Sequence, residues 1–154
     1  LNELITLTDE QVHSDYLLIH GKGDKERVVP KSPYLSKCLF KYKTVRNSYF
    51  EYKAIKYNNV FLSKNGKPLT HEAIEKMVRD TGTNCNVNSK IRCSPHTLRH
   101  TFAQMQLKNG LDIYALSRLM GHENISITQR YLEGLKDREI LKAGTKTSPL
   151  MNLE

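Results

Sequence analysis

The last third of the chain holds five residues that could act together in catalysis. Two are histidines on either side of an arginine, and a third histidine and a tyrosine follow at short intervals. His96, Arg99 and His100 lie within five positions, and Tyr131 follows His122 by nine. A free tyrosine has a pKa of roughly 10, so it attacks a phosphate only beside a proton acceptor and where the phosphate charge is neutralised. Imidazole and guanidinium groups can supply both conditions. The set therefore indicates transfer of a phosphodiester, such as that of DNA, to Tyr131.

A helix is predicted to carry the first three of these residues. Ser94-Pro95 is an N-cap serine followed by proline in the first turn, and Gly110 is typical of the position just past a helix end. The apolar face expected for this helix consists of Phe102, Met105 and Leu107.

Two shorter helices are predicted downstream. Asp112 is expected to cap a helix over 113–120 that Gly121 ends, which places His122 directly after it. Ser126 is expected to cap the next helix, which would carry Tyr131. A last helical pattern covers 135–143, and residues 144–154 form a tail after it.

The first part of the chain predicts a β-hairpin. Apolar and β-branched runs at 16–20 and 26–29 flank Gly-Lys-Gly-Asp-Lys at 21–25. Such a pattern is typical of an antiparallel pair with a glycine-rich, basic tip. A further strand is expected around Val60.

Two helices are predicted around that strand. Ser32-Pro33 begins the first, and Thr70 begins the second. Three- and four-residue spacing indicates a core stripe in the first helix, at Leu35, Leu39, Tyr42, Val45, Tyr49 and Tyr52, although interleaved lysines and arginines leave contact with DNA as an alternative. The second helix is expected to bury Ile74, Met77 and Val78, and to end at Thr81-Gly82.

Four pieces of the chain together resemble the catalytic domain of the tyrosine recombinases, the family of phage and conjugative-transposon integrases. They are 21–30 (Gly-Lys-Gly-Asp-Lys-Glu-Arg-Val-Val-Pro), 95–103 (Pro-His-Thr-Leu-Arg-His-Thr-Phe-Ala), 119–122 (Leu-Met-Gly-His) and Tyr131. The resemblance implies a mainly helical α+β fold with a small antiparallel sheet, and a catalytic domain over residues 1–143. It also implies site-specific recombination of double-stranded DNA through a 3′-phosphotyrosyl intermediate, by an integrase of a phage or other mobile element.

The resemblance assigns a role to each candidate residue. Tyr131 would be the nucleophile and Arg99 the clamp on the non-bridging phosphate oxygens. His96 would assist deprotonation of Tyr131, and His122 would donate to a non-bridging oxygen. Lys22, the first lysine of the Gly-Lys-Gly turn, would be the general acid for the departing 5′-oxygen.

Further residues are expected to support this set. Lys25 and Arg27 rival Lys22 by charge, and the DNA-binding set comprises Lys22, Lys25, Arg27 and Arg99. By resemblance, His100 is a supporting residue beside the motif. Glu3 matches the carboxylate of the family's Gly-x-Arg-x-x-Glu-Leu box.

That box exposes a departure from the family pattern. Leu1-Asn2-Glu3-Leu4 matches the residues directly after the family's first arginine, so this arginine would stand before Leu1. We therefore expect the chain to be a fragment of a longer integrase. Without that arginine we expect it to bind DNA weakly and to cleave it poorly.

Composition agrees with a nucleic-acid partner. The 154 residues carry 24 Lys and Arg against 16 Asp and Glu, a net charge of +8, which favours a polyanion. We expect a cytoplasmic bacterial or phage-encoded protein that assembles as a tetramer on DNA, with no membrane contact and no cofactor. Zinc at Cys85, Cys93, His96 and His100 is disfavoured because the spacing lacks paired Cys-x-x-Cys ligands.

Two other interpretations stay open from the sequence. A type IB topoisomerase uses similar chemistry without strand exchange, although the small size and the Gly-Lys-Gly hairpin favour a recombinase. A DNA-binding module that has lost catalysis belongs to a different functional class. A covalent-adduct assay separates this module from both enzymes.

Overall fold

The computed structural model describes residues 1–21, 23 and 25–132, and these form two compact units divided after Pro95. The predicted helix at 135–143, the tail at 144–154 and the proposed general acid Lys22 lie outside the described residues.

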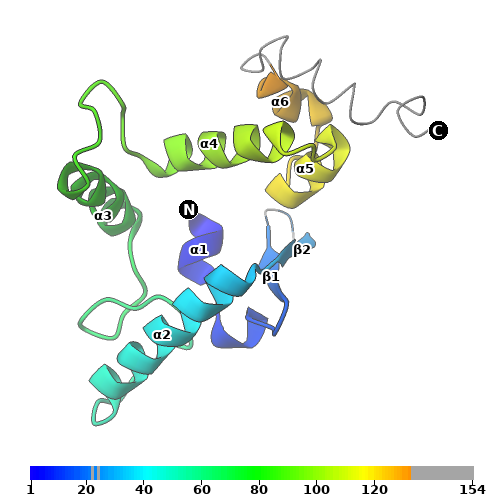
Figure 1. The fold of residues 1–154 in the computed structure, drawn as a ribbon. Helices are drawn as coiled ribbons and strands as arrows, with labels where there is room; N and C mark the ends of the chain where they lie inside the picture. Colours follow the sequence, from blue (N-terminus) through cyan, green and yellow to red (C-terminus); the bar gives the residue numbers. More distant parts are fainter. Residues whose placement is uncertain (22, 24, 133–154) are drawn as a thin grey trace, which may run out of the picture. The chain divides into compact units, whose positions relative to one another are not determined.

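The first unit begins with two short helices and a hairpin. They are α1 (Asn2–Thr6), the 3-10 helix η1 (Asp9–Gln11), β1 (Tyr16–His20) and β2 (Glu26–Pro30) (Figure 1). The strands pair antiparallel in the register Tyr16↔Pro30 to His20↔Glu26, which confirms the predicted hairpin. Gly21 N–H donates to the Lys25 carbonyl at 2.7 Å. Gly23 has φ of 75°, a conformation that favours glycine at the tip.

Two longer helices complete the first unit, α2 (Pro33–Phe50) and α3 (His71–Asn84). Both begin where the sequence predicts. The side chain of Ser32 accepts from Leu35 N–H, and that of Thr70 accepts from Ala73 N–H. Each cap satisfies an amide that the helix leaves without a partner.

The prediction of a strand around Val60 is wrong. Among the described residues the sheet has two strands, and the Val60 segment makes isolated bridges instead. Val60 is fully buried, and its N–H donates to the Leu7 carbonyl at 2.8 Å. The segment is therefore a core-filling connection whose apolar run reflects burial rather than strand pairing. The core around it is Leu7, Ile19, Leu39 and Val60, with Val12, Leu17, Val29, Tyr42 and Phe61 against it.

The core stripe predicted for α2 is only partly correct. Leu39 is buried and Tyr42 half-buried, but Val45, Tyr49 and Tyr52 are at least half exposed. The inward positions are instead Arg46 and Phe50. An arginine occupies the inner face because its guanidinium donates to Asp9 and to the carbonyls of residues 59 and 60. The α3 expectation fails similarly at Met77, which is 54% exposed, and α3 continues past Gly82 to Asn84.

The Asp9 carboxylate joins η1 to α2 through two basic residues. It lies 2.7 Å from Arg46 Nη2 and 3.0 Å from Lys43 Nζ. Burial alone would raise the pKa of the Asp9 carboxyl, but hydrogen bonds and charges from Arg46 and Lys43 outweigh it and hold this pKa below its usual value. The two ion pairs of Asp9 therefore stabilise the folded chain whenever the Asp9 carboxyl is ionised.

We expect Asp9→Asn to lower the free energy of unfolding at pH 7 by roughly 1–3 kcal/mol, because Arg46 keeps its burial and loses its charged acceptor. The lowered pKa sets the pH range of this effect. The stabilisation is complete above the unfolded-state pKa of about 3.9 and is lost as the pH falls through the lower folded-state value. Urea unfolding measures the free energy of unfolding of the native chain and of Asp9→Asn at each pH. The difference between the two should be constant from pH 7 to about pH 4 and should narrow as the pH falls further to 3.

Asp80→Asn is the matched control. Asp80 pairs with Lys76 across one turn of α3, with side chains 52% and 71% exposed. Such exposed pairs contribute about 0.3–0.5 kcal/mol. Equal destabilisation by the two substitutions would contradict the stabilising role assigned to Asp9.

The second unit consists of three helices, α4 (Pro95–Lys108), α5 (Ile113–Met120) and α6 (Ile125–Gln129), within its described residues. In Figure 1, α5 and α6 lie beside the C-terminal end of α4. The core of this unit is Ala103, Leu116 and Met120, with Leu107, Leu111 and Tyr131 packed against it. The expected inward face of α4 is therefore correct at Leu107 and wrong at Phe102 and Met105, which are 45% and 58% exposed.

A glycine-centred turn ends both α4 and α5. Gly110 has φ of 90°, and Leu111 N–H donates back to the Gln106 carbonyl. Gly121 has φ of 70°, and His122 N–H donates back to the Ser117 carbonyl. These are Schellman turns, in which a residue without Cβ adopts the left-handed conformation and the reversed chain satisfies the last carbonyls. Both glycines stand where the sequence predicts.

Candidate active site

α4 positions three of the candidate residues at its N-terminal end. His96 lies exposed in the first turn, and Arg99 and His100 come one turn later. Residues three and four apart share one face of a helix, so His96 is on the same side as both. Arg99 is half-buried because it turns towards the end of α5.

The C-terminus of α5 holds the Arg99 guanidinium beside His122. Arg99 Nη2 donates to the Met120 carbonyl at 2.5 Å and lies 3.1 Å from His122 Nε2. The last carbonyls of a helix carry partial negative charge and favour a cation. The Gly121 turn fixes the backbone of His122, and Arg99 and His122 are thereby held together.

The Tyr131 ring lies against two imidazole rings. Its ring centroid is 5.0 Å from that of His100, in an edge-to-face arrangement at 72°. The centroid of His122 is 6.2 Å away, with the rings nearly parallel at 17°. The structure therefore brings four of the sequence-predicted residues together in one unit, since Arg99 contacts His122 and both histidines flank Tyr131.

Two details of the predicted positioning of Tyr131 are wrong. The N-cap of α6 is Asn124, whose side chain accepts from Ser126 N–H and from the Ser126 hydroxyl. Asn124 takes this position because its amide oxygen reaches an amide two residues on. Tyr131 lies just past the end of α6, where its N–H donates to the Thr128 carbonyl at 3.0 Å.

Thr128 is a member of the site that the sequence pattern did not reveal. It is fully buried on α6, and its hydroxyl lies 2.8 Å from His122 Nδ1. Thr128 stands three residues before Tyr131, and its carbonyl accepts from Tyr131 N–H, so this spacing is a signal that could have suggested a shared position.

The hairpin residues lie in the first unit. The Glu3 carboxylate accepts two hydrogen bonds from Arg27, at 2.6 Å from Nη1 and 2.8 Å from Nη2. This two-point pairing joins α1 to β2 close to the tip of the hairpin, since Arg27 is one strand pair from the turn. It also shows that Arg27, a rival for the general acid, is held by a carboxylate, whereas Lys25 is exposed next to the tip.

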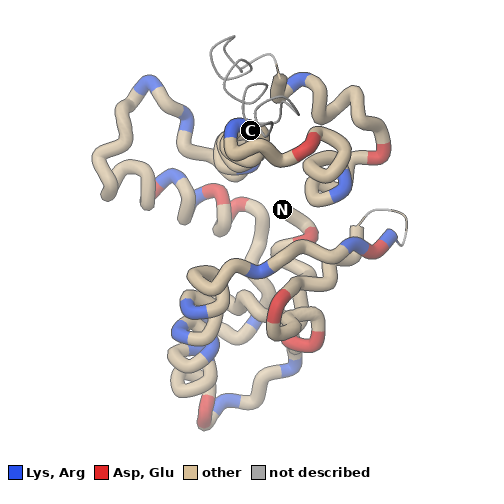
Figure 2. Tube along the Cα trace, turned by 45° about the vertical axis from the view of Figure 1, so that its right-hand side comes forward, with Lys and Arg blue, Asp and Glu red and all other residues tan. Residues whose placement is uncertain are grey.

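The first unit also carries the basic residues that interleave the aromatic side chains of α2. Figure 2 shows lysine and arginine positions along this helix. The residues are Lys37, Lys41, Lys43 and Arg46, of which Lys43 and Arg46 bind Asp9. α2 therefore presents Lys37 and Lys41, both exposed, among its outward side chains.

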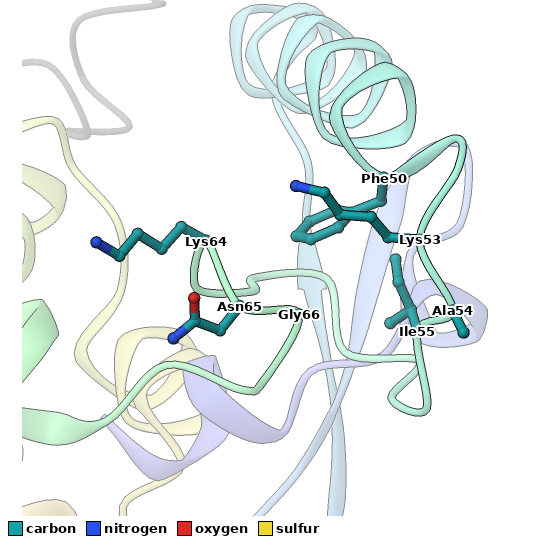
Figure 3. Close-up of a pocket in the computed structure, with 7 residues that line it drawn as sticks. All are labelled: Phe50, Lys53, Ala54, Ile55, Lys64, Asn65 and Gly66. Atoms are coloured by element: carbon teal, nitrogen blue, oxygen red, sulfur yellow. The ribbon is translucent and has the colours of Figure 1, made fainter.

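A pocket at the end of α2 contains none of the candidate residues. Figure 3 shows its lining, which is Phe50, Lys53, Ala54, Ile55, Lys64, Asn65 and Gly66. Lys53 Nζ lies 3.8 Å from the centroid of the Tyr49 ring, a cation–π contact that holds this lysine against the helix.

No metal-ligand cluster and no membrane-spanning helix occur in the described part of the chain. Within residues 1–21, 23 and 25–132, His, Cys, Asp and Glu side chains form no group of three or more with metal-binding geometry. Cys38, Cys85 and Cys93 are free thiols. No helix in these ranges is both long and apolar enough to cross a bilayer.

Comparison with known proteins identifies the class to which this fold and site belong. Residues 1–138 match the model of the phage integrase family. The chain belongs to that family, and its mainly helical fold with a two-stranded antiparallel sheet is that of the tyrosine recombinase catalytic domain.

Particular relatives are recombinases. The chain is 38% identical over 134 residues to the tyrosine recombinase XerD of Staphylococcus aureus (strain Mu50 / ATCC 700699), covering 85% of this chain and 44% of XerD. The XerA recombinase crystal structure matches with a TM-score of 0.80 and 30% identity, over 96% of this chain and 53% of that one.

A second structure shows the same fold in a protein bound to DNA. XerH site-specific recombinase, in a post-cleavage complex with palindromic difH substrate, matches with a TM-score of 0.76 and 23% identity, over 93% of this chain and 40% of that one. The chain thus spans about half the length of the recombinases that it matches.

Proposed function

We propose that this chain is the catalytic part of a site-specific recombinase that cleaves and rejoins double-stranded DNA through a covalent bond to Tyr131. The observation that carries the proposal is that the Tyr131 ring contacts two imidazoles, His100 and His122, while the Arg99 guanidinium contacts His122. Family membership and the net charge of +8 support DNA as the substrate.

The reaction exchanges one phosphodiester for another. Tyr131 Oη attacks the scissile phosphorus, the bond to the 5′-oxygen breaks, and a 3′-phosphotyrosyl bond and a 5′-hydroxyl result. Attack by a 5′-hydroxyl on that bond reverses the exchange and restores the phenol. The phosphotyrosyl linkage conserves the bond energy, so rejoining consumes no nucleotide.

Arg99 neutralises the phosphate during this exchange. Its contacts to Met120 and His122 both use Nη2, so Nε–H and Nη1–H can donate to non-bridging oxygens. The anchoring of Nη2 on the Met120 carbonyl preorganises the guanidinium, and preorganised donors stabilise developing charge without reorganising during the reaction.

The histidines divide between proton transfer and phosphate binding. His122, at 3.1 Å from Arg99, is assigned to a non-bridging oxygen. His96 is assigned to deprotonation of Tyr131, from the exposed first turn of α4. His100 packs edge-to-face on the Tyr131 ring and supports its orientation.

The hairpin is assigned to leaving-group protonation and DNA contact. Lys22 is the proposed general acid, and Lys25 is a proposed DNA contact. The Glu3–Arg27 pair is the proposed support that fixes the tip end of the hairpin on α1. Residues 1–143 are proposed as the catalytic domain, with a tail over 144–154. We further propose assembly as a tetramer on DNA in a bacterial cytoplasm.

The proposal is tested by trapping the covalent intermediate with the full gene product. A duplex with a nick close to the scissile phosphate loses its short 5′-hydroxyl fragment after cleavage, so the adduct accumulates on a denaturing gel. Strand exchange between two labelled duplexes identifies a recombinase. Relaxation of supercoiled DNA without exchange would identify a topoisomerase, and binding without adduct an inactive module.

For Lys22, we expect Lys22→Ala in the full gene product to slow cleavage of ordinary DNA by roughly 10²–10⁴. A substrate with sulfur in place of the bridging 5′-oxygen should show little defect, because sulfur leaves without protonation. Single-turnover cleavage of both substrates measures the difference. Lys25→Ala is the matched control. Any change in its cleavage rate should be the same on the ordinary and on the sulfur-containing substrate. A Lys22→Ala defect of equal size on both substrates would rule out the role.

A further inference from the structure

The Thr128 side chain contacts the imidazole nitrogen of His122 that lies away from Arg99. Its hydroxyl is 2.8 Å from Nδ1, and Thr128 has no exposed surface. A buried hydroxyl without a partner is costly, so the contact to His122 stabilises both groups. Thr128 itself stands in the last turn of α6, which Asn124 caps, and His122 comes directly after the Gly121 turn. Both partners are therefore fixed by the backbone.

Two contacts of the His122 ring indicate its tautomer. Arg99 has N–H donors and no acceptor, so an imidazole nitrogen that hydrogen-bonds to it must offer a lone pair. Arg99 Nη2 meets Nε2 at 3.1 Å. In a neutral ring the hydrogen then resides on Nδ1, and the Thr128 oxygen accepts it.

We propose that Thr128 is a positioning residue that holds His122 in the Nδ1–H tautomer and aims Nε2 at Arg99 and the phosphate. This inference rests on the proposed recombinase function for its catalytic meaning. The inference of the tautomer and of the ring orientation rests on the hydrogen bonds of His122 to Arg99 and Thr128 and does not depend on that function. In the same way, the partner of one imidazole nitrogen in a metal-bound histidine fixes the tautomer and the orientation of the ring.

The tautomer has a consequence for catalysis. With Nδ1–H bound to Thr128, His122 can donate to a phosphate oxygen only after Nε2 gains a proton. A phosphate draws the Arg99 guanidinium and brings negative charge, which favours the imidazolium. The proton comes from solvent as DNA binds. Thr128 then keeps accepting from Nδ1–H, and the ring donates from Nε2 without turning.

The first test reads the tautomer directly. Long-range ¹H–¹⁵N correlation spectra of the ¹⁵N-histidine-labelled chain distinguish Nδ1–H from Nε2–H rings, and His122→Gln identifies the signal of His122. We expect an Nδ1–H ring in the native chain and in Thr128→Ser, which keeps the hydroxyl. In Thr128→Val, which has nearly the same shape, the Nδ1–H population should fall. A native Nε2–H ring, or an unchanged spectrum in Thr128→Val, would overturn the proposal.

The second test reads cleavage in the full gene product. Thr128→Val should lower the rate constant at saturating nicked DNA by about 10- to 100-fold, the cost of removing the orienting partner of a histidine at metal sites. DNA affinity should stay near the native value, and Thr128→Ser should restore most of the rate. Thr101→Val, at an exposed threonine of α4, controls for the substitution itself. A purely structural role would instead lower the rate in proportion to the folded fraction measured by circular dichroism.

The two tests fail separately. If the native protein forms no DNA adduct, the proposed function fails, whereas the spectra still decide whether Thr128 sets the His122 tautomer. If cleavage is normal and the spectra of Thr128→Val and the native chain agree, Thr128 has no positioning role and the recombinase proposal stands.

Discussion

Tyr131→Phe in the full gene product should abolish the covalent DNA adduct while DNA binding stays nearly unchanged. Phenylalanine keeps the ring that packs on His100 and His122 and against the core of the second unit. It removes only the oxygen that would attack the phosphorus. A denaturing gel with nicked DNA measures the adduct, and a mobility shift at low salt measures binding.

Tyr114→Phe is the matched control, because Tyr114 is a tyrosine of the same unit and is 64% exposed on α5. It should form adduct at the native rate. Adduct formation by Tyr131→Phe would mean that a different side chain attacks the phosphate.

Arg99→Lys should slow cleavage by roughly 10²–10³, the usual cost of losing one preorganised donor group at a developing oxyanion. Lysine keeps the positive charge, so electrostatic attraction to DNA is retained. It loses the planar set of N–H groups that reaches the Met120 carbonyl, His122 and a phosphate together. Single-turnover cleavage at saturating DNA separates this loss from weaker binding.

Arg118→Lys provides the control for that substitution, since Arg118 is an exposed arginine in the last turn of α5. It should change cleavage little. Equal defects at both arginines would indicate that Arg99 acts through general charge rather than through its hydrogen bonds.

Local signals in the sequence predicted the elements that carry the site. Ser32, Thr70 and Asp112 cap helices as expected, and Gly121 ends α5. These signals succeed because capping and left-handed turns depend on a few neighbouring residues. The hairpin was predictable for the same reason, since its strands flank a glycine-rich turn.

Tertiary packing explains what could not be predicted. Spacing alone assigned Tyr49 to the core, but the inner face of α2 includes Arg46, which an apolar pattern excludes and which Asp9 makes favourable. Phe102 and Met105 are exposed, because the small Ala103 is the α4 residue buried against α5. Periodicity identifies an amphipathic helix more reliably than the residues that are buried.

In the candidate site, too, the sequence predicted some residues and tertiary packing determined the others. Arg99, His122 and Tyr131 were identified from residue type and spacing, and the structure brings them into contact. The Met120 carbonyl and Thr128 were not identified, because a backbone acceptor has no sequence signature and a lone threonine resembles any other buried residue. Their partnership depends on how α5 and α6 pack.

The most direct test of the central claim is identification of the residue bound to DNA. The trapped adduct of the full gene product would be digested with nuclease and then trypsin, and the nucleotide-bearing peptide sequenced by mass spectrometry. Trypsin cuts after Arg130 and Lys136, so we expect the modification on the peptide 131–136, in which Tyr131 is the only tyrosine. A nucleotide on any other peptide, or no adduct on nicked DNA, would contradict the assignment of Tyr131 as the nucleophile.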